Sequence, residues 1–270
     1  MNQVETLAKD PWRFPVELQD VYTSKGDKVP YTRAVVRTDT MSPLCSVGKT
    51  YKLISHQEVD ALTQPFVQTL GTHSKKVFCE GNGKIMLAQY DFRDISFTVP
   101  GHIDPNLPKA IDDVVGLRII IKNSYDAKQS VSIRIGALVL RCLNGMTAFN
   151  DRLSYNFSHR IGSEDPALPT PESVMASFTH TQAVVKQWSE RELTDTARVV
   201  IEDESVGRAV VSKRVLQEES HRFNEARTVW DFYNAFTYVI THKTKRLSNN
   251  GRIYRYDRLN QLFTDVVAPF

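Results

Sequence analysis

Hydrophobic and polar residues alternate with a period of two in several stretches of the first 165 residues. This period is typical of strands that bury one face. It predicts strands over residues 30–40, 46–54, 114–123 and 130–140, and a hairpin over residues 75–92 that turns at Gly81-Asn82-Gly83. The runs are short and end in turn signals. The pattern therefore predicts an antiparallel sheet with hairpins.

One segment of this half has a helical period instead. Ser55 is followed three residues later by Glu58, and apolar side chains then recur at helical spacing as far as Gly71. Ser and Glu at this spacing are typical of a capping box at the start of a helix. We expect an amphipathic helix here, with a kink at Pro65.

The pattern changes after the proline-rich stretch 162–173. Apolar residues then recur at helical spacing, which predicts helices over residues 171–203, 207–217 and 228–245. We therefore predict an α+β fold. A β-rich part with one amphipathic helix, residues 1–165, packs with a helical part, residues 166–270, and the two fold as one cooperative domain.

Composition narrows the function classes. Of the 270 residues, 41% are hydrophobic and 24% charged, which is typical of a globular protein. No apolar run approaches the roughly 18 to 20 residues of a membrane span, and no signal peptide is recognisable, so we expect no membrane partner and a cytoplasmic location. Cys45, Cys79 and Cys142 form no Cys-x-x-Cys pair, and motifs of nucleotide-binding loops, hydrolases and metalloproteases are missing. We expect no metal, no cofactor and no catalytic site.

The net charge of +3 is small, so the placement of the cations matters more than their number. If the strands around the turn at Asp126 pair so that residue numbers sum to about 252, Arg118 lies opposite Arg134, on the same sheet face as Lys122. Like charges opposed across a sheet are destabilising. Either carboxylates of the helical part or solvent compensate these charges, or this face of the sheet binds an anion. Tyr125 and Lys128, expected to be exposed in the turn, favour nucleic acid, because rings stack on bases while cations neutralise phosphates.

A second basic and aromatic segment lies near the C-terminus, where residues 241–258 carry six Lys or Arg against one Asp. We expect a flexible joint at Asn249-Asn250-Gly251. The alternative is a solvated helix end followed by a short strand, and a helix C-terminus itself favours cations. The candidate contacts in this segment are Lys243, Lys245, Arg246, Arg252, Tyr254, Arg255, Tyr256 and Arg258.

Three motifs carry a resemblance. Asn-Ser-x-Asp at 123–126 is followed by an apolar strand and Cys-x-Asn-Gly at 142–145, Tyr-Asn-Ala-x-Thr lies at 233–237, and an Arg-Thr-Asp strand at 37–39 precedes the first helix. In this order the motifs resemble the signature of a domain family found in phages and plasmids. The size and basic character of the chain are also similar to the Drc family of single-stranded-DNA-binding RNA polymerase cofactors of podoviruses that package an RNA polymerase. This resemblance implies a fold that is not an OB-fold, and recruitment of the phage RNA polymerase.

These observations lead to one expected function and two alternatives. We expect a non-enzymatic phage protein that binds single-stranded DNA with little sequence preference and supports transcription as an RNA polymerase cofactor, or replication, in the cytoplasm of the infected bacterium. Arg and Lys would neutralise phosphates, and Tyr125, Tyr254 and Tyr256 would stack on bases. The first alternative is a strand-annealing recombinase similar to RecT or Red-beta, acting as a homo-oligomer. The second is a host-takeover or structural protein that binds other proteins.

Overall fold

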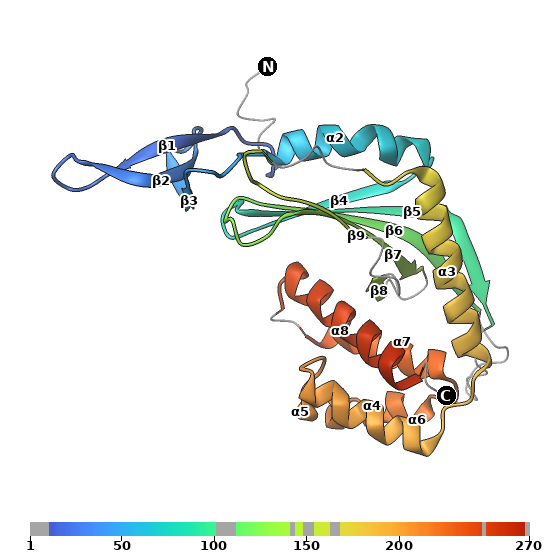
Figure 1. Ribbon diagram of the computed structural model, residues 1–270. Helices are drawn as coiled ribbons and strands as arrows, with labels where there is room; N and C mark the ends of the chain where they lie inside the picture. Colours follow the sequence, from blue (N-terminus) through green and yellow to red (C-terminus); the bar gives the residue numbers. More distant parts are fainter. Residues whose placement is uncertain are drawn as a thin grey trace. The chain divides into compact units, whose positions relative to one another are not determined.

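The computed structural model describes residues 11–100, 112–140, 144–147, 154–162, 168–244 and 247–267. Two sheets are followed by a series of helices (Figure 1), so the predicted α+β class is confirmed. Within these residues neither sheet closes into a barrel, in agreement with the expectation that the fold is not an OB-fold.

The first sheet has three antiparallel strands in the order β1-β2-β3, which comprise Val16–Tyr22, Lys28–Arg37 and Ser42–Gly48. The second has the order β4-β5-β6-β7-β8, with β9 beside β7. Its strands, β4 to β9, are Ser74–Glu80, Ile85–Val99, Asp113–Ser124, Val131–Val139, Asn144–Thr147 and Ser154–Phe157. The helices are α2 His56–Thr69, α3 Pro171–Glu190, α4 Asp195–Gly207, α5 Lys213–Glu218, α6 Ser220–Glu225, α7 Val229–Tyr238, the π-helix η2 Val239–Lys243 and α8 Asn249–Val267.

The chain forms two compact units that are interleaved in sequence. The first comprises Met1–Tyr90, Ile120–Ile133 and Ser154–Pro171, and the second comprises Asp91–Ile119, Arg134–Leu153 and Glu172–Phe270. Strands β5, β6 and β7 each continue from one unit into the other. The division into residues 1–165 and 166–270 stays a prediction.

The three-stranded sheet belongs to the first unit, and its β1–β2 hairpin projects away from α2 and β4 (Figure 1). β1 and β2 pair regularly from Val16↔Arg37 to Asp20↔Arg33, but the next pair is Tyr22↔Lys28. Residues 29–32 therefore form a bulge in β2. A bulge bends its strand and redirects side chains. Tyr31 within it has a φ of 62°, a left-handed conformation that is uncommon for residues other than glycine.

The base of this sheet contributes to the core of the first unit. The buried cluster there comprises Phe14, Val35, Leu44, Val47, Tyr51 and Tyr125. Helix α2 begins as predicted: Ser55 Oγ accepts the Glu58 amide at 3.1 Å, and the Glu58 carboxylate accepts the Ser55 amide at 2.6 Å. The capping box is therefore confirmed, as is the β4–β5 hairpin that follows the helix.

Gly83 in the β4–β5 turn provides a test of this packing. Its φ is 91°, and a Cβ placed there would lie 2.6 Å from both Cε1 and Cζ of Phe14. The ring is confined, because Phe14 is buried and the Arg37 guanidinium lies over it at 3.9 Å from the centroid. Gly26 has a similar φ of 88° with open space around it. We therefore expect Gly83→Ala to lower the free energy of unfolding by about 2 kcal/mol more than Gly26→Ala.

Urea denaturation of the two glycine variants measures this difference. Because both substitutions place a side chain at a positive φ, their comparison isolates the steric contact with Phe14. Equal losses in the two variants would show that the ring yields to the new methyl group, and that the turn is less tightly packed than the distances indicate.

The helical part differs from the sequence prediction in two helices. The single helix predicted over residues 171–203 is wrong, because α3 ends at Glu190 and α4 starts at Asp195 behind a Thr194 cap. Between the helices, the Leu193 amide donates to the Arg227 carbonyl at 2.8 Å. This pairing with a distant segment interrupts the helix. The helix predicted over 207–217 is likewise replaced by the end of α4 and the short α5, whereas α7 and η2 follow the prediction for 228–245.

Aromatic rings dominate the core of the second unit. The ring centroids of Trp188 in α3 and Phe263 in α8 lie 5.4 Å apart, and the ring centroid of Tyr233 in α7 lies 5.1 Å from that of Phe263. Tyr256 and Leu259 of α8 are buried as well. Within the described ranges, no helix has the length and apolar character that a membrane span requires.

Candidate nucleic-acid interface

Two arginines of the expected cationic sheet face pair with carboxylates of the same chain. Arg118 of β6 donates from Nε and Nη2 to the Asp91 carboxylate at 2.5 and 2.9 Å, and both side chains are largely buried. Arg134 of β7 pairs with Asp257 of α8. The alternative in which carboxylates of the helical part compensate these charges is therefore confirmed for Arg134, whereas the carboxylate that pairs with Arg118 belongs to β5 of the sheet itself. The expectation that the two arginines form an open cationic face is wrong.

The two lysines expected beside the turn between β6 and β7 differ in exposure. Lys122 is half-buried, whereas Lys128 is exposed. The assumed pairing of β6 and β7, with residue numbers that sum to about 252, stays a prediction.

Tyr125 is fully buried, so the expectation that it is exposed in the turn is wrong. Its ring stacks on His56 with centroids 4.1 Å apart, and its hydroxyl accepts the His56 amide at 2.8 Å. The Cys45 thiol donates to its carbonyl. Packing against residues distant in sequence draws the side chain inward, and in this conformation it cannot stack on a base.

The preceding residue, Asn123, is the centre of a buried hydrogen-bond network in the first unit. Its Nδ2 donates to the Ile54 carbonyl at 3.1 Å and to His56 Nδ1 at 3.0 Å. Its Oδ1 accepts from His159 Nε2 and from the Ser124 amide, both at 2.9 Å. Each polar atom of the amide thus has two partners. The Asn-Ser-x-Asp motif therefore fixes the end of β6.

His56 of this network is neutral near pH 7. Burial lowers the pKa of His56 to about 4, and burial also lowers the pKa of His159. His56 Nε2 lies 2.9 Å from the Gly83 carbonyl, which can only accept, so this nitrogen carries the proton and Nδ1 accepts from Asn123. Sequence patterns gave no sign of this pairing, because its members lie far apart along the chain.

The C-terminal basic segment is helical. The flexible joint expected at Asn249-Asn250-Gly251 is wrong, and so is the short strand of the alternative, because α8 runs without interruption from Asn249 to Val267. Tyr256 is buried, and its hydroxyl lies 2.6 Å from that of Thr241, so its expected exposure is wrong too. Tyr254, in contrast, is 55% exposed.

Three arginines of α8 and Tyr254 form what we call the α8 cluster: Arg252, Tyr254, Arg255 and Arg258. Arg255 Nη1 donates to the Val210 carbonyl at 2.9 Å, and Arg258 Nη1 donates to the Arg208 carbonyl at 2.5 Å. These carbonyls lie just beyond the C-terminus of α4, where the helix dipole favours cations. The guanidinium of Arg258 also lies over the Tyr254 ring, 4.2 Å from its centroid.

The charges of Arg255 and Arg258 are not compensated by carboxylates. Within the part of the chain that the structure describes, neither forms an ion pair. Burial and the nearby charge of Arg258 lower the pKa of Arg255. A guanidinium has five N–H donors, and these contacts occupy only some of them. The site therefore combines fixed positive charge, unused donors and an exposed ring.

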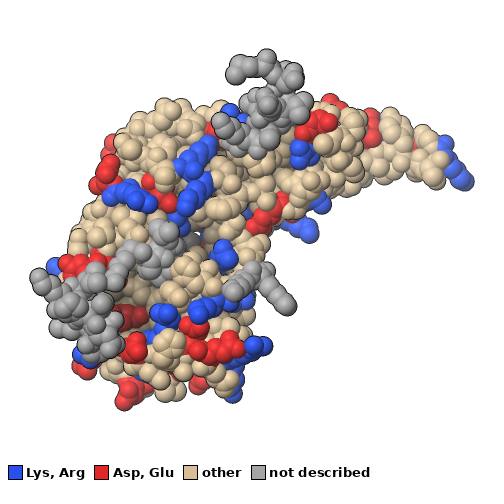
Figure 2. Space-filling model, turned by 180° about the vertical axis from the view of Figure 1, so that it is seen from behind, with Lys and Arg blue, Asp and Glu red and all other residues tan. Residues whose placement is uncertain are grey.

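The remaining candidates contribute less. Lys243 pairs with Glu219 at 2.7 Å, which compensates its charge. Lys245 and Arg246 lie outside the described residues. Over the face drawn in Figure 2, Lys and Arg side chains are interspersed with Asp and Glu. Binding of a polyanion would therefore depend on local clusters rather than on one large basic surface.

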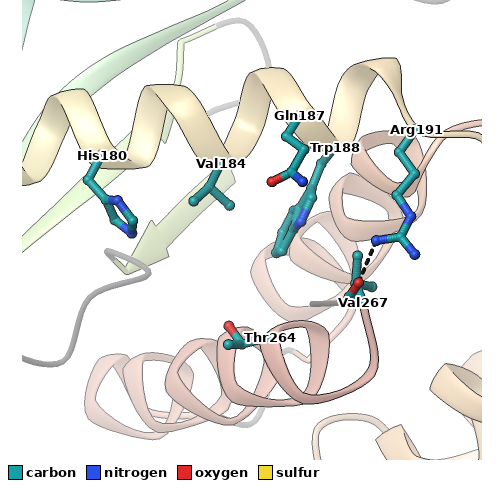
Figure 3. A pocket seen from close by; sticks show the side chains of 7 residues that line it. All are labelled: His180, Val184, Gln187, Trp188, Arg191, Thr264 and Val267. Carbon is teal, nitrogen blue, oxygen red and sulfur yellow. Dashed lines mark hydrogen bonds between the residues drawn. The ribbon is translucent and has the colours of Figure 1, made fainter. Parts of the chain in front are cut away.

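A small pocket of about 130 Å³ lies between α3 and α8 (Figure 3). Trp188 forms one wall, and His180 and Gln187 lie along the same helix. Its arginine, Arg191, donates to the Val267 carbonyl. The described residues contain no group of three or more His, Cys, Asp or Glu that could hold a metal ion. The pocket is too small for a polymer, so the α8 cluster is the better candidate for a polyanion site.

Comparison with known proteins gives one match. Residues 43–260 match DUF932, a domain of unknown function. The matched range includes the α8 cluster but not β1 and β2. No curated protein and no solved structure matches the chain.

Proposed function

The chain belongs to the DUF932 family, and we propose that it is a non-enzymatic protein that binds single-stranded DNA with little sequence preference. One observation carries this proposal: Arg258, uncompensated by carboxylates, lies over the exposed ring of Tyr254, and a second uncompensated guanidinium, that of Arg255, is held on the same helix. The guanidinium groups bind phosphates, and the ring offers a surface on which a base can stack.

The geometry favours a single strand over a duplex. A ring can stack on a base only when the base is unpaired and turned outward, whereas phosphate contacts alone would not distinguish the two forms. The arginines are also held in place before binding by the Val210 and Arg208 carbonyls, so little side-chain entropy is lost when they meet a phosphate. On the resemblance of the motifs, we place this binding in the cytoplasm of an infected bacterium, in support of a phage RNA polymerase.

The α8 cluster is tested by the double variant Arg255→Ala/Arg258→Ala. We expect its dissociation constant for an oligothymidylate of about 20 nucleotides to rise on the order of tenfold. Fluorescence anisotropy at salt concentrations between about 50 and about 200 mM measures this, and the slope of log affinity against log salt should become shallower by about 1.4. The wild-type protein should bind a duplex of the same length more weakly.

A matched control removes the same charge elsewhere. Lys213 and Arg214 are exposed on α5, and Arg214 already pairs with Glu218 at 2.7 Å, so Lys213→Ala/Arg214→Ala should retain most of the affinity. An equal loss of affinity for oligothymidylate in the two double variants would exclude the α8 cluster as the binding site. If the wild-type protein binds no single strand in low salt, the proposed function is wrong. Annealing of complementary strands by the wild-type protein would favour the recombinase alternative.

A further inference from the structure

We infer that the bulge of β2 presents Tyr31, with Lys49 beside it, as a second contact for single-stranded DNA. The ring would stack on a base while the ammonium group meets a neighbouring phosphate. This inference rests on the proposed function and extends it to a surface that the sequence motifs did not indicate.

The first observation is the exposure of Tyr31. Its side chain is 76% exposed, the largest value among the exposed large hydrophobic residues described. Burial of ring surface is what normally holds a tyrosine in place, so such exposure has no benefit for the free protein. The residue also has a φ of 62° in the bulge opposite β1. Unfavourable backbone conformations of this kind are concentrated at ligand-binding sites.

The second observation is the cation next to the ring. Lys49 Nζ lies 5.9 Å from the centroid of the Tyr31 ring. Arg33 Nη2 holds this part of the chain in place, because it donates to the Lys49 carbonyl at 3.2 Å and to the Tyr51 carbonyl at 3.0 Å. Tyr31 belongs to β2 and Lys49 directly follows β3, and these two strands pair where Thr32 lies opposite Gly48.

The surroundings favour a polyanion over an apolar protein surface. The tip of the β1–β2 hairpin, residues 23–28, reads Thr-Ser-Lys-Gly-Asp-Lys and is exposed throughout. A Lys or Arg side chain lies at the far end of this projecting hairpin in Figure 2. Tyr22 adds a second exposed ring to the hairpin; Lys28 opposite it pairs with Asp20 at 2.6 Å, so Lys25 and Lys49 are the cations available to a phosphate. Rings interleaved with cations are the composition with which proteins bind single strands.

The hairpin also lies outside the family domain. The match to DUF932 begins at residue 43, whereas Tyr31 belongs to β2, which ends at Arg37. The hairpin is thus an element that this chain carries in front of the matched domain. The hairpin projects away from α2 and β4 (Figure 1), and its residues from Tyr22 to Lys28 are exposed. It is therefore accessible to a long flexible ligand.

The test compares Tyr31→Ala with Tyr31→Phe and uses two probes. Anisotropy is measured with an oligothymidylate of about 20 nucleotides and with an abasic strand of the same length, which has the phosphates but no bases. We expect Tyr31→Ala to weaken binding of oligothymidylate by about fivefold to a hundredfold and to leave binding of the abasic strand unchanged. Tyr31→Phe, which keeps the ring, should bind nearly as the wild-type protein does.

Met41→Ala is the matched control. Met41 is 63% exposed, has a φ of 53° and lies in the turn between β2 and β3, so its replacement alters the same sheet without removing a ring. The inference is overturned if Tyr31→Ala binds oligothymidylate as tightly as the wild-type protein, or loses affinity equally for both strands. A change of mass in sedimentation without a change in DNA binding would overturn it too and would assign the ring to a protein contact. Failure of the wild-type protein to bind any strand would instead reject the proposed function.

Discussion

Replacement of Asn123 by alanine is expected to lower the free energy of unfolding by about 4 kcal/mol or more. The substitution leaves four buried groups without their partner: the Ile54 carbonyl, His56 Nδ1, His159 Nε2 and the Ser124 amide. Each unsatisfied buried group costs about 1 to 3 kcal/mol. Because whole domains are stable by only about 5 to 15 kcal/mol, the variant should unfold at far lower urea concentration than the wild-type protein.

Two further variants make this result interpretable. Asn224→Ala removes the same side chain from an exposed position on α6 and should change stability by less than about 0.5 kcal/mol. His159→Phe keeps a ring against Tyr51, on which His159 stacks with centroids 5.1 Å apart, but removes the two polar contacts of the imidazole, with Asn123 Oδ1 and with the Lys52 carbonyl. His159→Phe should lower the free energy of unfolding by about 1 to 2 kcal/mol, and this variant should remain folded even if Asn123→Ala does not. An Asn123→Ala protein as stable as the wild type would show that the network has no part in holding β6.

Acid is expected to destabilise the protein at pH values where most carboxylates are still ionised. The pKa of His56 falls from an ordinary value of 6.5 to about 4 in the folded chain, so the unfolded state takes up the proton first as the pH falls. The contribution of neutral His56 to the free energy of unfolding is therefore fully present above pH 6.5 and is lost progressively as the pH falls below that value. The loss attributable to His56 should reach about 2 kcal/mol at pH 5 and about 3 kcal/mol at pH 4. The lowered pKa of His159 acts in the same direction.

Urea denaturation between pH 7 and pH 4 measures this dependence. His56→Gln cannot titrate and retains an N–H group for the Gly83 carbonyl, so its stability should vary less between pH 6.5 and pH 5 than that of the wild-type protein. His221→Gln, an exposed position on α6, should leave the wild-type dependence intact. If the His56 and His221 variants respond alike, burial of His56 is not the cause of acid sensitivity.

Local signals in the sequence predicted the elements that depend on neighbouring residues. The capping box of Ser55 and Glu58 and the hairpin turn around Gly83 each involve residues a few positions apart, and both were found as predicted. The end of α3 was missed, although Thr194 is a recognisable cap, because the apolar period continued beyond it. The helix is interrupted where the Leu193 amide donates to the Arg227 carbonyl. A contact between residues so far apart in sequence leaves no local pattern from which it could be predicted.

The candidate site was predicted less well, because charge pairing and burial depend on tertiary contacts. Arg118 and Arg134 have carboxylate partners far away in sequence, at Asp91 and Asp257. In the sequence, Tyr256 belongs to a segment rich in basic and aromatic residues, which indicated exposure. The helical spacing of Ile253, Tyr256 and Leu259 instead places Tyr256 on the buried side of α8. This period was visible in the sequence, but the Asn-Asn-Gly stretch was interpreted as a joint rather than as the first turn of a helix.

The passage of β5, β6 and β7 from one compact unit into the other limits how this protein can be divided. No single cut in the gene yields either unit, since each is assembled from three separated stretches of chain. A fragment that ends before residue 172 would contain the complete first unit together with strand ends that belong to the second. Neither unit can therefore be inherited or exchanged as a contiguous module, and an insertion within β6 would disturb both at once.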